Sequence, residues 1–257
     1  MKGKRTQVLK DKVALVTGSS RGIGAGIVRL FARHGAKVVV HGRDMPRLAA
    51  VHAEIGRKGG RAIHVMADIT KLNEIEAMRR QIEQRLGPID ILVANAGGNY
   101  VMPGPLESIG EDGWRLAIDG NLTAIFLSLK SFLPGMKERR RGSIVTISSA
   151  AARRAHPATP IPYAAAKAGI IMMTQHLATQ VGPFNIRVNC ITPETILTEN
   201  NRERIPEAQQ AMLSEAHPLR RLGTVEDVAQ AALYLASDNA GWVTGVVLDV
   251  AGGADML

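Results

Sequence analysis

The 257-residue sequence has little cysteine, few aromatic residues and no long hydrophobic run. Cys190 is the single cysteine, which excludes an internal disulfide and a cysteine-based metal site. Because no run of about 18 apolar residues occurs, we expect no membrane-spanning helix. Residues 1–12 are basic but contain no apolar segment of the kind that a secretory signal needs. These features are compatible with a reducing compartment, and we expect a cytoplasmic protein with no bound metal.

The charge balance is basic, whereas aromatic residues make up only 4% of the chain. The 32 Lys and Arg residues against 23 Asp and Glu give a net charge of +9, which suits either a nucleic-acid partner or an anionic cofactor or substrate. The densest basic run, Lys137–Arg141, precedes an expected strand, and we interpret it as a solvated helix end. Because few aromatic residues stand among the basic ones, base stacking is disfavoured and we expect no nucleic-acid partner.

Short apolar runs alternate with helical patterns along most of the chain. Strands are expected at residues 12–17, 37–41, 62–66, 89–94, 142–147, 185–191 and 246–250. This alternation predicts a single α/β domain over residues 1–257: a doubly wound parallel seven-stranded sheet with helices on both faces, the Rossmann fold. Residues 1–11 are expected to form a loose tail. The long polar connection 192–221 is expected to form a mobile, helical substrate lid.

Three glycines, Gly18, Gly22 and Gly24, follow the first expected strand and open a helix. Glycines let the backbone come close to a pyrophosphate, and a helix N-terminus offers free N–H groups and a favourable dipole. An ordinary tight turn is the competing interpretation. The strand–turn–helix context favours a dinucleotide-binding loop.

The second expected strand ends at Gly42, Arg43 and Asp44, where a dinucleotide fold meets the adenosine ribose. A carboxylate there would bind the 2′-hydroxyl of NAD, whereas an arginine would pair with the 2′-phosphate of NADP. Arg43, together with Arg21 of the glycine loop, favours NADP. Asp44 leaves NAD open, although it can equally be the N-cap of the next helix.

Tyr163 and Lys167 lie four residues apart in a stretch rich in alanine, so both face the same side of a helix. An ammonium group beside a phenol favours the phenolate, and we expect the pKa of Tyr163 to fall toward neutrality. The phenol could then exchange a proton with a carbonyl or hydroxyl oxygen. This spacing is common in amphipathic helices, so its weight depends on the other motifs. One of them is Asn121, a poor residue for a helix interior, which predicts a kink or a functional amide in the helix 111–137.

Together these motifs resemble the short-chain dehydrogenase/reductase family. The matching residues are Thr17-Gly18-x-x-x-Gly22-x-Gly24, Asn95-Ala96-Gly97, Asn121, Ser149, Tyr163-x-x-x-Lys167 and Pro193. The resemblance implies an NADP(H)-dependent enzyme similar to 3-oxoacyl-carrier-protein reductases, which reduces a ketone or 3-oxoacyl thioester to a secondary alcohol. It also implies a homotetramer. The alternatives are an NAD-dependent alcohol, sugar or steroid dehydrogenase of the same family and, less supported, a non-catalytic cofactor-bound sensor or nucleic-acid binder.

The resemblance also implies residue roles. Tyr163 would give a proton to the substrate oxygen as hydride arrives, and Lys167 would lower the pKa of Tyr163 and bind the nicotinamide ribose. Ser149 would position the substrate oxygen, and Asn121 would hold a water that links Lys167 to solvent. The cofactor would contact Gly18, Ser20, Arg21, Gly22, Ile23, Gly24, Arg43, Asp68, Ile69, Asn95, Ala96, Gly97, Tyr163, Lys167, Pro193, Ile196 and Thr198.

Several of these residue roles have alternative interpretations. Ser148 competes with Ser149 as the functional hydroxyl, and Asp68 can simply cap the helix after Thr70. Glu194 departs from the glycine that usually follows the proline in this family, which would alter substrate entry or cofactor contacts. The basic segment Arg153-Arg154 would face an anionic substrate such as a phosphopantetheine thioester, or belong to a subunit contact. The sequence does not reveal the substrate.

Overall fold

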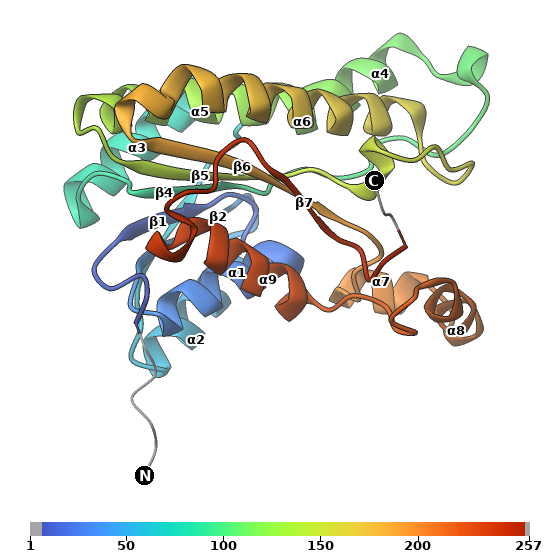
Figure 1. Cartoon of the computed structure of the whole chain (residues 1–257), viewed down its shortest axis with the longest axis horizontal. Helices are drawn as coiled ribbons and strands as arrows, with labels where there is room; N and C mark the ends of the chain where they lie inside the picture. The colour runs from blue at the N-terminus through green and yellow to red at the C-terminus, as the bar shows by residue number, and fades with distance from the viewer. Residues whose placement is uncertain (1–6, 255–257) are drawn as a thin grey trace.

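The computed structural model describes residues 7–254 as one α/β unit built on a parallel sheet (Figure 1). The strands are β1 (Val13–Val16), β2 (Lys37–Gly42), β3 (Arg61–Met66), β4 (Ile91–Ala94), β5 (Gly142–Ile147), β6 (Ile186–Pro193) and β7 (Val247–Val250). Their order in the sheet is β3-β2-β1-β4-β5-β6-β7, and every neighbouring pair is parallel. The predicted doubly wound sheet is confirmed, with small shifts at the strand ends.

Helices cover both faces of the sheet (Figure 1). One face carries α1 (Gly22–Arg33), α2 (Met45–Arg57) and α9 (Val225–Ala236), and the other carries α3 (Leu72–Leu86), α5 (Ala124–Glu138) and α6 (Ile161–Val181). Alternate residues of β1 serve the two layers, since Val16 packs with the α1 side and Leu15 with the α3 side. Burial on both faces explains why these strands are continuous apolar runs.

The N-terminal segment is ordered closer to the chain start than we expected. Leu9 is fully buried in the core beneath α1, and its N–H donates to the carbonyl of His34 at 3.0 Å. The prediction of a loose tail over residues 1–11 is therefore wrong for residues 7–11, because Leu9 has an apolar site to fill. Residues 1–6 lie outside the described part of the chain.

The basic run after α5 contacts neighbouring strand ends. Arg139 donates to the carbonyl of Ile89 at 2.7 Å, and Arg141 forms an ion pair with Asp90 at 2.7 Å. These contacts fit the helix-end interpretation of this run. They also engage part of the charge that a nucleic-acid surface would need.

The long helix predicted around Asn121 is distorted at that residue. It consists of α4 (Glu111–Ile118), a π-helical segment (Asp119–Thr123) and α5. Asn121 is fully buried, and its side-chain amide donates to the carbonyl of Ala117 at 2.8 Å. A side chain that competes for a helix carbonyl favours such a local change of winding. The irregularity predicted at Asn121 is therefore present as a π-helical segment, whereas a functional role for the amide stays a prediction.

The helical stretch Glu111–Glu138 is long enough to cross a membrane, and an 18-residue window within it has a mean hydropathy of 1.3, contrary to our reading of the sequence. Of that window 44% is buried, and α5 packs against α3 and the sheet. A core helix of a globular fold passes the same test, so this feature alone is weak support for a span.

The connection from β6 to α9 contains two short helices, α7 (Glu199–Arg204) and α8 (Glu207–Ala216), which lie beyond one end of the sheet (Figure 1). The predicted helical character of the lid is confirmed. Its mobility stays a prediction. The segment before α6 is irregular apart from one turn of 3₁₀ helix at Ala150–Ala152, as its prolines led us to expect.

Candidate active site

The glycine loop between β1 and α1 is shaped for close approach by a ligand. Gly22 has a φ of +55°, a conformation that residues with a side chain rarely adopt. A Cβ atom at Gly24 would lie 2.4 Å from the carbonyl oxygen of Gly18, so only glycine fits there. Asn95 supports the loop from β4, since its Nδ2 donates to the carbonyls of Thr17 at 2.9 Å and Gly18 at 3.2 Å. This cradle at the start of α1 fits the pyrophosphate of a dinucleotide.

His41 is a support of this loop that the sequence did not reveal. The N–H of Gly18 donates to Nδ1 of His41 at 3.1 Å, and Nε2 lies 3.1 Å from the carbonyl of Ala67. Burial lowers the pKa of His41 to about 4, so the ring is neutral near pH 7 and Nε2 carries the proton. His41 thereby joins the glycine loop to the ends of β2 and β3. Within the sequence it was only one residue of a buried strand.

A pocket of about 190 Å³ lies beside the glycine loop at the carboxyl ends of β1–β4. It is lined by Gly18, Ser20, Arg21, His41, Gly42, Arg43, Ala67, Asp68, Ile69, Thr70, Asn95, Ala96, Gly97, Tyr100 and Gly120. The structure therefore brings together most residues that we expected at the adenosine half of a cofactor. Tyr100 is a further lining residue that the sequence analysis missed.

The two charged residues at the end of β2 have different environments. Arg43 is exposed and lines the pocket together with Arg21. Asp44 is instead the N-cap of α2: its carboxylate accepts from the N–H of Arg47 at 3.2 Å and pairs with the side chain of Arg47 at 3.1 Å. The N-cap alternative for Asp44 therefore holds, and Arg43 is left as the ligand-facing charge.

Asp68 both lines the pocket and orders the turn that follows β3. Its carboxylate accepts from the N–H of Thr70 at 3.0 Å and from the Thr70 hydroxyl at 2.8 Å. Partial burial raises the pKa of Asp68, but these hydrogen bonds and the nearby Arg43 outweigh it and the net pKa is lowered. Asp68 is thus a carboxylate near neutral pH. It does not cap α3, whose N-cap is Lys71.

The structure places Ser149 beside Tyr163 and directs Ser148 elsewhere. The Ser149 side chain acts on the Tyr163 phenol and lowers its pKa. Its hydroxyl oxygen also accepts from the N–H of Ala151 at 3.2 Å. Ser148 is buried and its hydroxyl donates to the carbonyl of Lys167 at 2.7 Å. Only Ser149 is therefore positioned to meet the same ligand oxygen as the phenol.

Lys167 lies close to Tyr163 but is fixed by a backbone carbonyl. Its Nζ is 5.5 Å from the centre of the Tyr163 ring and donates to the carbonyl of Ile147 at 2.9 Å. A Cβ atom at Gly97 would lie 3.6 Å from this Nζ and 2.5 Å from Oδ1 of Asn121. Gly97 is therefore next to both, and a side chain at this position would displace the Asn121 amide.

Asn121 joins the distorted helix to the loop after β4. Its Oδ1 accepts from the N–H of Gly98 at 3.0 Å, and its Nδ2 donates to the Gly98 carbonyl at 3.0 Å. The amide thus holds the loop that contains Gly97 against Lys167. The water-holding role that the family resemblance implies for Asn121 stays a prediction.

The pKa of Tyr163 is raised rather than lowered, so our expectation was wrong for the protein as it stands here. Burial raises the pKa of the phenol, and the neighbouring Ser149 side chain lowers this pKa only in part. The ammonium of Lys167 faces the carbonyl of Ile147 and does not outweigh burial. Tyr163 therefore carries its proton near neutral pH, which suits a proton donor.

We expect the replacement of Lys167 by methionine to stabilise the fold in a pH-dependent way. Burial lowers the pKa of Lys167 from 10.5 to about 8. Below pH 8 the folded chain bears the full cost of a buried charge, whereas between pH 8 and 10.5 only the unfolded chain stays charged and the wild type gains stability. The advantage of methionine should thus shrink by about 3 kcal/mol across this range. Urea unfolding of both proteins at several pH values measures it, and a constant difference would contradict the assignment.

The segment after β6 reaches the glycine loop through α7. Pro193 is the last residue of β6. A Cβ atom at Gly22 would lie 3.4 Å from Cγ2 of Thr198, so Thr198 lies beside the glycine loop. Its hydroxyl caps α7 by accepting from the N–H of Asn201 at 3.3 Å, and its contact with the cofactor stays a prediction. The side chain of Ile196 is buried against Gly223, so this predicted residue offers a ligand its backbone only. The side chain of Ile23 is half-buried and packs in part against the core.

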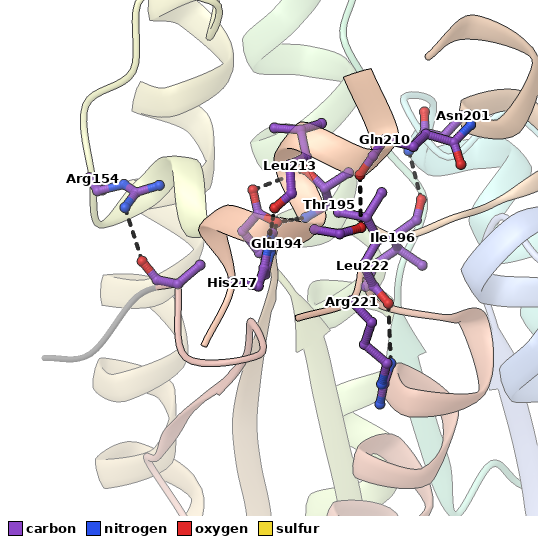
Figure 2. A network of polar contacts seen from close by, with 12 residues as sticks. Arg154, Glu194, Thr195, Ile196, Asn201, Gln210, Leu213, His217, Arg221 and Leu222 are labelled. Atoms are coloured by element: carbon purple, nitrogen blue, oxygen red, sulfur yellow. Dashed lines mark hydrogen bonds and ion pairs between the residues drawn. The ribbon is translucent and has the colours of Figure 1, made fainter. Parts of the chain in front are cut away.

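The basic segment before α6 is tied to the C-terminal part of the chain. Arg153 forms an ion pair with Asp249 of β7 at 3.6 Å. Arg154 donates to the carbonyl of Ala254 at 2.9 Å (Figure 2). Both guanidinium groups thus have partners within the chain, which weakens the prediction that they face an anionic substrate.

Comparison with known proteins connects this geometry to a family. Residues 18–255 match the sequence model of the family described as enoyl-(acyl carrier protein) reductase. A 3-oxoacyl-[acyl-carrier-protein] reductase of Chlamydia muridarum is 38% identical over 247 residues, which cover 96% of this chain and 98% of that protein.

Two solved structures are similar over nearly the whole chain. A 3-oxoacyl-[acyl-carrier protein] reductase of Brucella melitensis with bound NAD has a TM-score of 0.88 at 34% identity, covering 98% of this chain and 94% of that one. A gluconate 5-dehydrogenase from Burkholderia cenocepacia, in complex with NADP and tartrate, has a TM-score of 0.89 at 32% identity and covers 96% of each chain.

Proposed function

The chain is an oxidoreductase of the short-chain dehydrogenase/reductase family, and from this premise we propose that it uses NADPH to reduce a ketone or a 3-oxoacyl thioester to a secondary alcohol. The observation that carries the proposal is the placement of Ser149 beside the Tyr163 phenol, with Lys167 beside the ring. A protonated phenol is the form that a carbonyl reduction requires, and burial maintains it near neutral pH.

Each side chain has a defined task in this reaction. NADPH, when bound, supplies the hydride. The hydroxyl of Ser149 donates a hydrogen bond to the substrate carbonyl oxygen and fixes its position next to Tyr163. Tyr163 passes its phenolic proton to that oxygen as negative charge develops there. Lys167, with a pKa of about 8, is charged near pH 7 and stabilises the phenolate that remains.

The preference for NADPH follows from Arg21 and Arg43. Both line the adenosine-side pocket, and Asp44 is engaged as the N-cap of α2. A guanidinium group can bind a 2′-phosphate through charged hydrogen bonds, each worth about 1.5–3 kcal/mol. The alternative, an NAD-dependent alcohol, sugar or steroid dehydrogenase, would need a carboxylate free for the ribose.

Replacement of Arg43 by alanine should weaken NADPH binding about tenfold to hundredfold and leave NADH binding within about twofold. Nicotinamide fluorescence gives both dissociation constants. Arg57→Ala, in the exposed last turn of α2, is the matched control and should leave both dissociation constants unchanged. If wild type binds NADH as tightly as NADPH, the cofactor part of the proposal fails and the oxidative alternative takes its place.

Glu199 is a residue of the lid that opposes an anionic cofactor. Its Oε2 accepts from the N–H of Gly22 at 3.2 Å, at the start of α1 where a phosphate would be favoured. A carboxylate a few ångströms from a phosphate repels it by about 1 kcal/mol. Glu199→Gln removes this negative charge and should therefore tighten NADPH binding about fivefold. Glu203→Gln, on the same helix, should change little. Weaker binding by Glu199→Gln would mean that the carboxylate supports the loop instead.

We further propose the homotetramer implied by the family. Phe126 on α5 and Met172 on α6 are 49% and 54% exposed. Phe126 and Met173 line an apolar groove of about 510 Å³ between these two helices. Near β7, Trp242 is fully exposed. Apolar side chains on both surfaces support two interfaces between copies. The exposure of Met172 also argues against α6 being covered on all sides by one subunit.

The substrate is a small carbonyl compound, and an acyl thioester is one candidate. We test the class by following NADPH consumption with a panel of ketones and 3-oxoacyl thioesters. If the protein consumes NADPH with neither a ketone nor a 3-oxoacyl thioester, the proposal is excluded. The cytoplasmic location stays a prediction from the sequence.

A further inference from the structure

The lid leaves and re-enters the fold through a narrow base, here called the neck and formed by residues 194–198 and 217–223. The N–H of Leu197 donates to the carbonyl of Gly223 at 2.8 Å, and the N–H of Gly223 donates to the carbonyl of Thr195 at 3.1 Å. Ile196 and Gly223 form a parallel β-bridge. Helices α7 and α8 are therefore connected to the rest of the fold by two backbone segments that are hydrogen-bonded to each other.

Glu194 and His217 link the two sides of the neck (Figure 2). Nε2 of His217 lies 2.6 Å from the Glu194 carboxylate, and Nδ1 lies 2.7 Å from the carbonyl of Leu213. A backbone carbonyl can only accept, so Nδ1 carries a proton. The His217 side chain is 4% exposed, which shields this contact from solvent.

Glu194 also fixes the residue that follows it. Its carboxylate accepts from the N–H of Thr195 and, at 2.9 Å, from the Thr195 hydroxyl. Thr195 leads directly into Ile196 and Thr198, the segment that faces the glycine loop. One carboxylate therefore binds the start of this segment and the returning end of the lid at once.

No other charged side chain that lines the pocket beside His217 and Glu194 pairs with either of them. The other charged groups that line the same pocket are paired elsewhere: Asp249 with Arg153, and Arg221 with Asp227. The chain after β7 closes over the imidazole, since a Cβ atom at Gly252 would lie 3.2 Å from Cδ2 of His217.

We propose that Glu194 and His217 are a positioning pair, which holds residues 195–198 in place for the nicotinamide end of the cofactor. The inference rests on the proposed function, because it concerns the same cofactor site. It gives a role to the residue by which this chain departs from the glycine usual in its family. Neither side chain touches the reacting atoms, so the pair acts through the segment that it fixes.

The test uses Glu194→Ala, His217→Ala and the double variant of the full chain. Each single variant should weaken NADPH binding about tenfold, the low end for a lost charged hydrogen bond. The double variant should bind NADPH no more weakly than the single variant with the lower NADPH affinity. The reason is that substitutions of two residues in contact have non-additive effects on the binding free energy. At saturating NADPH, kcat should stay within about threefold of wild type, since Ser149, Tyr163 and Lys167 are untouched.

A second readout needs no cofactor. Arg202 and Arg204 are exposed trypsin sites on the lid, and cleavage there should be about tenfold faster in each alanine variant, since loosening the neck exposes the lid more often. Glu54→Ala is the matched control, because it removes the 2.8 Å ion pair with Arg29 far from the neck. That variant should show wild-type NADPH binding and wild-type cleavage of the lid.

His217→Gln separates positioning from packing. Its amide N–H can donate to Glu194, so this variant should recover most of the NADPH affinity that His217→Ala loses. If an alanine variant does not fold, His217→Gln against His217→Asn carries the test, because asparagine is too short to reach Glu194 and should bind NADPH about tenfold more weakly.

Three results would overturn the proposal: both alanine variants within twofold of wild type in NADPH binding and cleavage, additive losses in the double variant, or no recovery in His217→Gln. Failure of the wild type to bind NADPH is a different result. It would remove the proposed cofactor, while the cleavage rates, measured without cofactor, would still decide whether the pair holds the neck.

Discussion

Replacement of Tyr163 by phenylalanine should lower kcat about a thousandfold while NADPH binding stays within about threefold of wild type. The variant keeps the ring beside Lys167 but loses the hydroxyl that lies beside Ser149. Without it, the developing alkoxide keeps the hydrogen bond from Ser149 but loses the phenol that would transfer a proton to it. Steady-state turnover and NADPH fluorescence titration measure the two quantities separately.

The control is Tyr234→Phe, since Tyr234 lies on α9 and is 45% exposed. It should keep wild-type turnover. If Tyr163→Phe retained wild-type activity, another group would have to donate the proton, and the assignment of Tyr163 would be wrong. If it lost NADPH binding to the same extent as turnover, its role would be in binding.

Replacement of Gly24 by alanine should weaken NADPH binding more than a hundredfold. The added Cβ would lie 2.4 Å from the carbonyl oxygen of Gly18 and 2.6 Å from Nδ2 of Asn95. Neither atom can move without opening the turn between β1 and α1. The loss should appear in the NADPH dissociation constant and, through strain in the loop, in a lower Tm.

Gly56→Ala is the matched control, because a Cβ at Gly56 in α2 meets no atom within 4 Å. Alanine there should leave NADPH binding unchanged and raise stability by about 0.5–1 kcal/mol, since glycine weakens a helix interior. Wild-type NADPH affinity in Gly24→Ala would show that the glycine loop is an ordinary turn.

The fold and the main motifs were predictable because they depend on local pattern. The strand before Gly18 and the helix after Gly24 are visible as apolar periodicity, and Tyr163 and Lys167 meet because they are four residues apart on α6. The distortion at Asn121 was also predictable, since asparagine competes for a helix carbonyl one turn away.

The supporting contacts were not predictable because they join distant parts of the chain. His41 meets Gly18 only through the pairing of β1 with β2, and Glu199 meets Gly22 across 177 residues. The raised pKa of Tyr163 also depends on burial, which sequence spacing does not report. Glu194 was likewise only a departure from the glycine usual in the family, because its partner His217 lies 23 residues away in the sequence.

The most direct test of the central claim is isotope transfer from NADPH deuterated at the nicotinamide C4 position. The account predicts that deuterium appears on the carbinol carbon of the alcohol made from a ketone or 3-oxoacyl thioester, and that Tyr163→Phe forms this product about a thousandfold more slowly. Two samples of NADPH should be used, each deuterated on one of the two faces of the nicotinamide ring at C4. One of the two samples must then deliver deuterium to the alcohol. Alcohol formed without deuterium from either, or no alcohol from any substrate of the panel, would contradict it.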